Sequence, residues 1–118
     1  MAFRYRKFNV YQDAKNLHKE IIFLVNEFPR QYQYLADQVK RSSLSIVLNI
    51  AEGSSKQSDK DFNRFIAISL GSADEVVASF EVALDLKLVT TQQFQTLEQK
   101  LESISKQLGG LSKTLRHS

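Results

Sequence analysis

The chain has 118 residues, of which 42% are hydrophobic and 25% charged, and these proportions fit one globular domain, not a disordered chain. It has no cysteine, which excludes a disulfide framework and a thiolate metal site. The formal net charge of +3 is small for a dedicated DNA-binding domain, although residues 1–30 carry six basic and three acidic side chains.

No segment predicts export or membrane insertion. The N-terminus is basic, but no apolar stretch of the kind found in secretory signals follows it. The longest nearly uncharged stretch, residues 42–51, is far shorter than the roughly 20 apolar residues that span a bilayer. We therefore expect a cytoplasmic protein without membrane contact.

The first predicted helix covers about residues 10–28. Asn9 is its expected N-cap, with Gln12 as the capping-box partner, and Pro29 is expected to end it because proline disfavours the α conformation in the preceding residue. Apolar residues recur at intervals of four and three, as in a helix packed in a bundle. They are Val10, Ala14, Leu17, Ile21, Leu24 and Phe28.

The second predicted helix covers about residues 35–51 and is expected to stop at Gly53, since glycine commonly follows a helix C-terminus. A third helix is expected to open at Ser58, because Asp61 completes a Ser-x-x-Asp start close to a capping box. Its apolar seam runs to Ala83.

The fourth predicted helix begins near Thr90 or Thr91. Gly109 and Gly110 weaken its last turns by about 1 kcal/mol each, so residues 110–118 are expected to fray. Short connections favour antiparallel packing of consecutive helices. The sequence therefore predicts a single all-α domain over residues 1–118, an antiparallel up-down-up-down four-helix bundle with a basic N-terminal arm at residues 1–8.

The second and third helices carry more apolar surface than a monomeric bundle needs. A helix that is apolar on all sides is buried on more than one side, which favours a closed, symmetric homo-oligomer. The alternative is that the bundle twists enough to bury these side chains within one chain. The expected interface residues are Leu44, Val47, Leu48, Phe65, Ile68, Gly71 and Ser72.

The sequence offers no pattern for catalysis or for a cofactor. His18 and His117 have no second metal ligand at helical spacing, and no His and Asp arrangement can be assigned to activate a serine. The segment Gly53-Ser54-Ser55-Lys56 lacks the first glycine of a phosphate loop, and no strand precedes it. We therefore expect no catalytic residue, metal or cofactor, and predict that the protein is not an enzyme.

Two central polar residues predict an architectural role. Asn49 lies among apolar neighbours, where a buried amide needs partners and commonly fixes register or oligomer state. Glu52 lies at the C-terminal end of the second helix, where the helix dipole disfavours a carboxylate. Arg41 is about 16 Å away along the same helix. Arg64 is therefore the expected partner in a structural ion pair, with a residue of another subunit as the alternative.

The central residues also form a signature, Gln38-x-x-Arg41-Ser42-Ser43-x-Ser45-Ile46-x-x-Asn49-Ile50-Ala51-Glu52-Gly53. It is followed by Phe62-x-Arg64-Phe65 and Gly71-Ser72-Ala73-x-Glu75, and preceded by Phe8-x-Val10-Tyr11-Gln12-x-Ala14. Over nearly the whole chain this pattern resembles the 23S rRNA intervening-sequence protein family, whose members are often called "four helix bundle protein".

The resemblance implies an antiparallel four-helix bundle that forms a ring-like homopentamer without enzymatic activity. It also implies a relation to the accessory proteins of diversity-generating retroelements, which share the fold and engage nucleic acid and a reverse transcriptase. Arg41, Asn49, Glu52 and Arg64 carry over as motif positions.

Three positions depart from the family's pattern. Val47 stands where proline is common, Leu48 where a small or polar residue is usual, and Ser69 where alanine is common. The second helix is therefore expected to be straighter than is typical, with a more apolar outer face.

The leading functional hypothesis is a homo-oligomeric scaffold that binds RNA or DNA through the phosphate backbone without reading sequence. A nucleic-acid enzyme such as a reverse transcriptase is a further expected partner. The alternative is a protein-interaction module whose basic groups only keep it in solution. The expected nucleic-acid contacts are Arg4, Arg6, Lys7, Lys40, Arg41, Lys56, Lys60 and Arg64.

Overall fold

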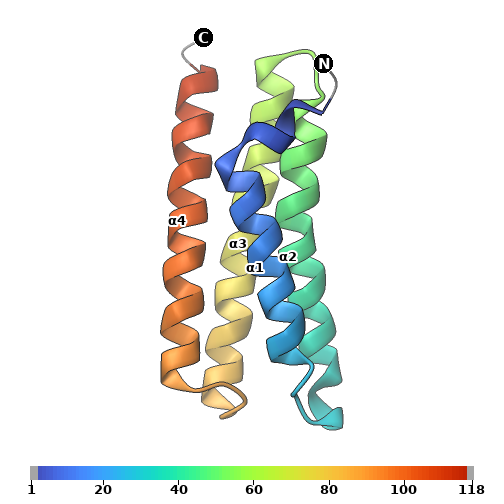
Figure 1. Cartoon of the computed structure of the whole chain (residues 1–118), viewed down its shortest axis with the longest axis vertical. Coiled ribbons are helices and arrows are strands. Elements are labelled where there is room, and N and C mark those ends of the chain that lie inside the picture. The colour runs from blue at the N-terminus through green and yellow to red at the C-terminus, as the bar shows by residue number, and fades with distance from the viewer. Residues whose placement is uncertain (1–2, 117–118) are drawn as a thin grey trace.

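The computed structural model describes residues 3–116, which form four α-helices joined by short connections. The helices are α1 (Asn9–Val25), α2 (Gln33–Ser54), α3 (Asp59–Asp85) and α4 (Thr91–Arg116), and two short 3-10 turns, η1 (Arg4–Lys7) and η2 (Arg30–Tyr32), precede α1 and α2. The helices alternate in direction within one bundle of 46 × 21 × 19 Å (Figure 1). This confirms the predicted all-α, up-down-up-down bundle.

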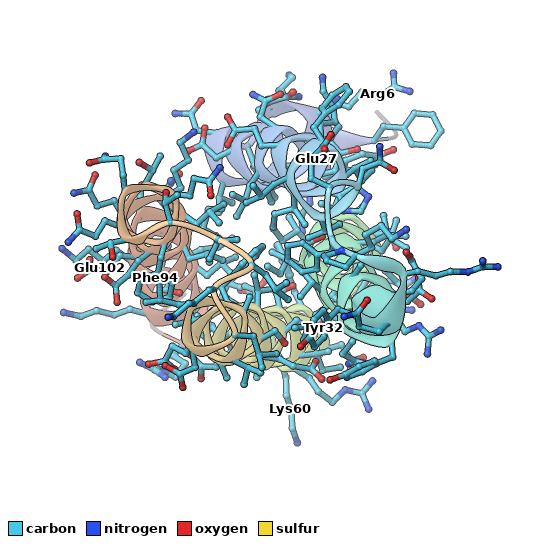
Figure 2. All side chains as sticks on the ribbon, turned by 90° about the horizontal axis from the view of Figure 1, so that it is seen from below. Arg6, Glu27, Tyr32, Lys60, Phe94 and Glu102 are labelled. Atoms are coloured by element: carbon cyan, nitrogen blue, oxygen red, sulfur yellow. The ribbon has the colours of Figure 1, made fainter. Side chains whose placement is uncertain are left out.

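The core runs along the axis of the bundle, where side chains from all four helices meet (Figure 2). Each helix contributes an isoleucine that is almost completely buried: Ile21, Ile46, Ile66 and Ile104. The contact of α2 with α3 is the most extensive, whereas the contact of α1 with α4 is the thinnest. The bundle is therefore held most firmly along its α2–α3 side.

The predicted starts of α3 and α4 are confirmed by their caps. The backbone N–H of Asp61 donates to the Ser58 hydroxyl at 3.1 Å. At α4, the N–H of Gln93 donates to the Thr90 hydroxyl at 3.0 Å, and the N–H of Thr90 donates to the Gln93 side chain at 2.9 Å. These bonds satisfy N–H groups that a helix start leaves without partners.

The boundaries of α1 differ from the prediction. Phe8, not Asn9, is the N-cap residue, and it has no side-chain cap. The Gln12 side chain instead donates to the carbonyl of Arg6 at 3.2 Å, so it ties η1 to α1. The helix ends at Val25, well before Pro29, and Phe28 reaches the core from the connection.

Gly53 does not end α2, which continues to Ser54, and its φ is not positive. Its role is steric, because a Cβ atom at this position would lie 2.7 Å from the Cβ of Phe65 and 2.9 Å from the Cδ1 of Phe62. The glycine therefore allows the end of α2 to approach the start of α3 closely.

In the structure α4 continues to Arg116, past residue 110, from which fraying is expected. Leu111 and Leu115 pack against the core, and the Ser112 hydroxyl donates to the Asn63 side chain. These tertiary contacts hold the last turns despite the two glycines. Residues 117 and 118 of the predicted tail lie outside the described residues.

We expect Gly53→Ala to lower the free energy of unfolding by about 1–3 kcal/mol, because the added methyl group must push two phenylalanine side chains apart. Gly110→Ala is the matched control, since nothing lies within 4 Å of the added Cβ atom. It should raise the stability by about 0.5–1 kcal/mol, as alanine does in a helix. Urea denaturation at equal protein concentration measures both, and a neutral Gly53→Ala would contradict the steric argument.

Candidate functional site

The turn η1, the α2–α3 connection and the last turns of α4 lie at the same end of the bundle (Figure 1), and these segments are rich in basic residues. The register of α1 against α4 follows from two contacts: Gln107 donates to Asp13 at 2.9 Å, and Lys100 pairs with Glu20 at 2.7 Å. Because the helices are antiparallel, each step back along α1 is matched by a step forward along α4. The start of α1 therefore lies beside the last turns of α4, close to residue 111.

We name this region, residues 3–8, 52–64 and 109–116, the basic end. It includes Lys113 and Arg116, which the sequence analysis missed because it assigned them to a fraying tail. A fourth helix that runs to the end of the chain, packed antiparallel to the third, would have placed both residues at this end of the bundle. The basic end holds eight basic groups, Arg4, Arg6, Lys7, Lys56, Lys60, Arg64, Lys113 and Arg116, against three carboxylates, Glu52, Asp59 and Asp61.

Arg4 anchors η1 to the bundle. Its Nε donates to the carbonyl of Ser54 at 2.8 Å, and its guanidinium carbon lies 5.2 Å from the centre of the Phe62 ring. The Ser54 carbonyl belongs to the last turn of α2, where such groups lack helical partners. Arg4 therefore has a structural role although it is exposed, as Arg6 and Lys7 are.

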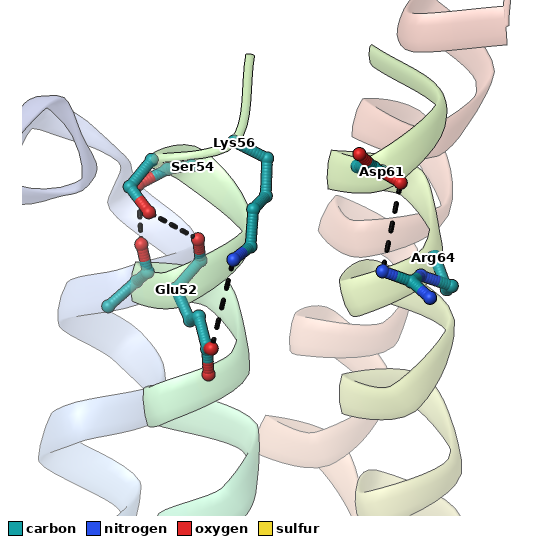
Figure 3. A network of polar contacts seen from close by, with 7 residues as sticks. Glu52, Ser54, Lys56, Asp61 and Arg64 are labelled. Atoms are coloured by element: carbon teal, nitrogen blue, oxygen red, sulfur yellow. Dashed lines mark hydrogen bonds and ion pairs between the residues drawn. The ribbon is translucent and has the colours of Figure 1, made fainter. Parts of the chain in front are cut away.

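Glu52 and Arg64 do not form the predicted ion pair. Glu52 pairs with Lys56 at 3.9 Å, and Arg64 pairs with Asp61 at 3.7 Å (Figure 3). Lys56 and Arg64 also lie 5.1 and 5.5 Å from the centre of the Phe65 ring. A neighbour three or four residues away thus neutralises each group, and these exposed pairs add little stability.

Lys40 and Arg41 lie apart from the basic end. They precede Ser54 by more than three turns of α2, a distance of about 20 Å. Lys40 pairs with Asp37 at 3.5 Å. A hydrogen bond from Gln33, together with the charge of Lys40, lowers the pKa of Asp37, so this carboxylate is firmly ionised. The basic residues predicted to form one nucleic-acid site therefore divide into two groups, one at the basic end and the other formed by Lys40 and Arg41.

Asn49 is half-buried at the α2–α3 contact and its amide has partners. Its Nδ2 donates to the carbonyl of Ser45 at 2.8 Å and to the Ser45 hydroxyl at 3.0 Å. The Ser45 hydroxyl lies 2.8 Å from that of Ser72 on α3. Asn49 thus belongs to a polar chain that joins the two helices.

The predicted interface residues separate into exposed and buried groups. Leu44, Leu48 and Ile68 expose 39%, 54% and 47% of their surface. Val47 and Ser72 are instead buried within the chain's own bundle, which corrects their assignment to an interface. We define the outer α2–α3 face as Leu44, Leu48, Phe65, Ile68 and Gly71, of which Phe65 is half-buried.

His18 lies between α1 and α2, with its Nδ1 2.6 Å from the Ser43 hydroxyl. Partial burial lowers the pKa of His18. Among residues 3–116, no three His, Cys, Asp or Glu side chains are arranged to hold a metal ion. None of the helices in this part of the chain has the length and hydropathy to cross a membrane.

Two comparisons place the chain among known proteins. The model of the family "23S rRNA-intervening sequence protein" matches residues 6–110. A protein of unknown function from Bacteroides thetaiotaomicron, described as belonging to the S23 ribosomal protein family, shares the fold with a TM-score of 0.82 and 24% sequence identity. That likeness covers 88% of this chain and 95% of the Bacteroides chain. No curated protein matches the sequence.

We expect Glu52→Gln and Arg64→Met each to change the free energy of unfolding by less than about 1 kcal/mol, because both groups are exposed and paired with neighbours four and three residues away along the chain. Their effects should add in the double variant. Denaturation of the four proteins at one protein concentration measures this. Large losses that the double variant partly recovers would instead require the two residues to meet across a subunit boundary.

Proposed function

The chain belongs to the 23S rRNA-intervening sequence protein family, and we propose that it is a non-catalytic, homo-oligomeric scaffold that binds nucleic acid through the phosphate backbone. We propose a ring of five subunits, as the resemblance to this family implies. The observation that carries the proposal is spatial: the outer α2–α3 face borders the basic end at Phe65, over whose ring Lys56 and Arg64 lie. Assembly through Leu44, Leu48 and Ile68, farther along the two helices, leaves the rest of the basic end open.

The outer α2–α3 face supports self-association. Leu48 and Ile68 expose about half of their surfaces to water, and burying such side chains is favourable by roughly 25 cal/mol per Å². A Cβ atom at Gly71 would meet nothing within 4 Å, so this position leaves open space for a neighbouring helix. A ring formed through these sides of the bundles would direct all basic ends to one side.

The distribution of charge supports nucleic-acid binding. The whole chain has a net charge of +3, yet the basic end alone carries eight basic groups and three carboxylates. The excess of positive charge is therefore concentrated at one end, and the rest of the chain is slightly acidic. Such a surface contacts phosphates and releases their counterions without reading bases. RNA or DNA is the proposed ligand, and a nucleic-acid enzyme such as a reverse transcriptase is a second proposed partner.

One observation favours the alternative, a protein-interaction module without a nucleic-acid role. Two cations of the basic end, Lys56 and Arg64, already have carboxylate partners four and three residues away along the chain, Glu52 and Asp61. Both pairs are exposed, however, and surface pairs of this kind exchange partners at little cost. The dependence of binding on salt separates the two functions.

For the assembly, we expect Leu48→Glu to dissociate the oligomer into helical monomers, because the substitution forces a charge into a dry interface. Phe23→Glu is the control, since Phe23 is exposed on α1, outside the proposed interface. Light scattering at micromolar concentration, with circular dichroism for helix content, reports both. A monomeric wild-type protein would refute the proposed assembly.

For the nucleic acid, affinity should fall steeply with salt and depend little on sequence. Replacing Lys56 and Lys60 with glutamine should flatten the slope of log K against log salt by about one to two units, one for each lost phosphate contact. The control replaces Lys40 and Arg41 with glutamine and should leave the slope unchanged, because these residues lie outside the basic end. Equal slopes for the wild type and the two double variants would show that Lys56 and Lys60 do not contact the nucleic acid. An absence of binding at low salt would favour the protein-interaction module.

A further inference from the structure

The first described residues combine exposed aromatic and basic side chains. Phe3 exposes 61% of its surface, and the guanidinium carbon of Arg6 lies 4.7 Å from the centre of its ring. Tyr5 contacts Phe3 edge to face at 6.1 Å, and it contacts Tyr11 of α1 in the same way at 4.8 Å. Residues 3–8 contain no carboxylate. An exposed aromatic ring is thus held within a purely basic segment.

This segment is fixed to the bundle at several points. Arg4 donates to Ser54 of α2, and the carbonyl of Arg6 accepts from the Gln12 side chain of α1. Phe8 stacks on Phe62 of α3 with ring centres 6.2 Å apart and ring planes 13° apart. The φ of Phe3 is 67°, a left-handed conformation that is uncommon for residues other than glycine. The ring of Phe3 is therefore presented to solvent by an ordered turn.

Other exposed aromatic residues lack this combination. Phe23 and Tyr34 expose 78% and 66% of their surfaces, but no cation lies over either ring in the part of the chain that the structure describes. Phe3 differs because Arg6 covers its ring and Lys7 follows nearby. Lys113 belongs to the last turns of α4, which lie at the same end of the bundle as η1, so it adds positive charge at this end.

Proteins bind single-stranded nucleic acid by stacking its bases on aromatic rings while cations contact the backbone. A duplex keeps its bases paired and stacked, so it cannot use an exposed ring in this way. We propose that the segment of residues 3–7 is a stacking platform for single-stranded nucleic acid, in which an unpaired base stacks on Phe3 and flanking phosphates contact Arg6 and Lys7. This inference rests on the proposed nucleic-acid function and specifies the class of ligand.

A tryptophan introduced at position 3 tests the stacking directly, because the chain has no tryptophan of its own to contribute to the emission. In Phe3→Trp, a single-stranded oligouridylate of about 12 nucleotides, within the usual site sizes, should quench the tryptophan emission. An RNA duplex of the same length should bind without quenching it. Phe23→Trp is the matched control, an exposed aromatic position on α1, and should show no quenching with either RNA. Binding of the oligouridylate without quenching of Phe3→Trp would overturn the proposal.

Affinities provide an independent measurement. Phe3→Leu keeps an apolar side chain but removes the aromatic ring, so it should weaken oligouridylate binding by about 5-fold to 150-fold. It should leave duplex binding unchanged, whereas replacing Arg6 and Lys7 with glutamine should weaken both. An equal loss of affinity for the two ligands with Phe3→Leu, or no loss for either, would refute the stacking role but not the nucleic-acid function. Failure of the wild-type protein to bind either RNA would refute the nucleic-acid function itself.

Discussion

The close contact of α2 with α3 is the constraint on which the remaining structure depends. Small residues allow it: Gly53 makes room for the Phe62 and Phe65 side chains, and the Ser69 hydroxyl donates to the carbonyl of Ile46 across the contact at 3.0 Å. A buried hydroxyl without a partner costs about 1–3 kcal/mol, so these bonds penalise a shifted register. In the described part of the chain, every buried side-chain N or O atom has a partner. The contact is therefore both close and specific in register.

Both proposed functional surfaces follow from this register. It places the last carbonyl groups of α2 beside η1, where Arg4 binds Ser54 and fixes the N-terminal segment to the basic end. It also leaves Leu48 and Ile68 facing outward, since they lie at positions of α2 and α3 that the contact does not bury. Small and polar residues thus bring the two helices together beside the apolar core, and the exposed leucine and isoleucine form the proposed interface.

The spacing of apolar residues was sufficient to predict the four helices, since that periodicity reflects which side of each helix is buried. The errors arose where tertiary contacts override local preference. Gly53 resembled a helix terminator but serves a close approach, and the glycines of α4 were outweighed by the packing of Leu111 and Leu115. The predicted Glu52–Arg64 pair is absent for a different reason: each residue pairs with an oppositely charged neighbour four or three residues away along the chain. Which basic groups share one end depends on helix register, which spacing alone does not provide.

The modest charge of one subunit also explains why assembly and binding belong together in the proposed function. Part of the positive charge is offset within the chain: Arg4 anchors η1, and Lys56 and Arg64 must exchange carboxylate partners for phosphates. Each subunit then offers only a few phosphate contacts, and affinity through so few contacts is weak at physiological salt. A ring that directs several basic ends toward one strand makes each further contact effectively intramolecular, so the combined affinity greatly exceeds that of one subunit. A protein with a net charge of only +3 can bind a polyanion in this way without the dense positive field of a monomeric DNA-binding domain.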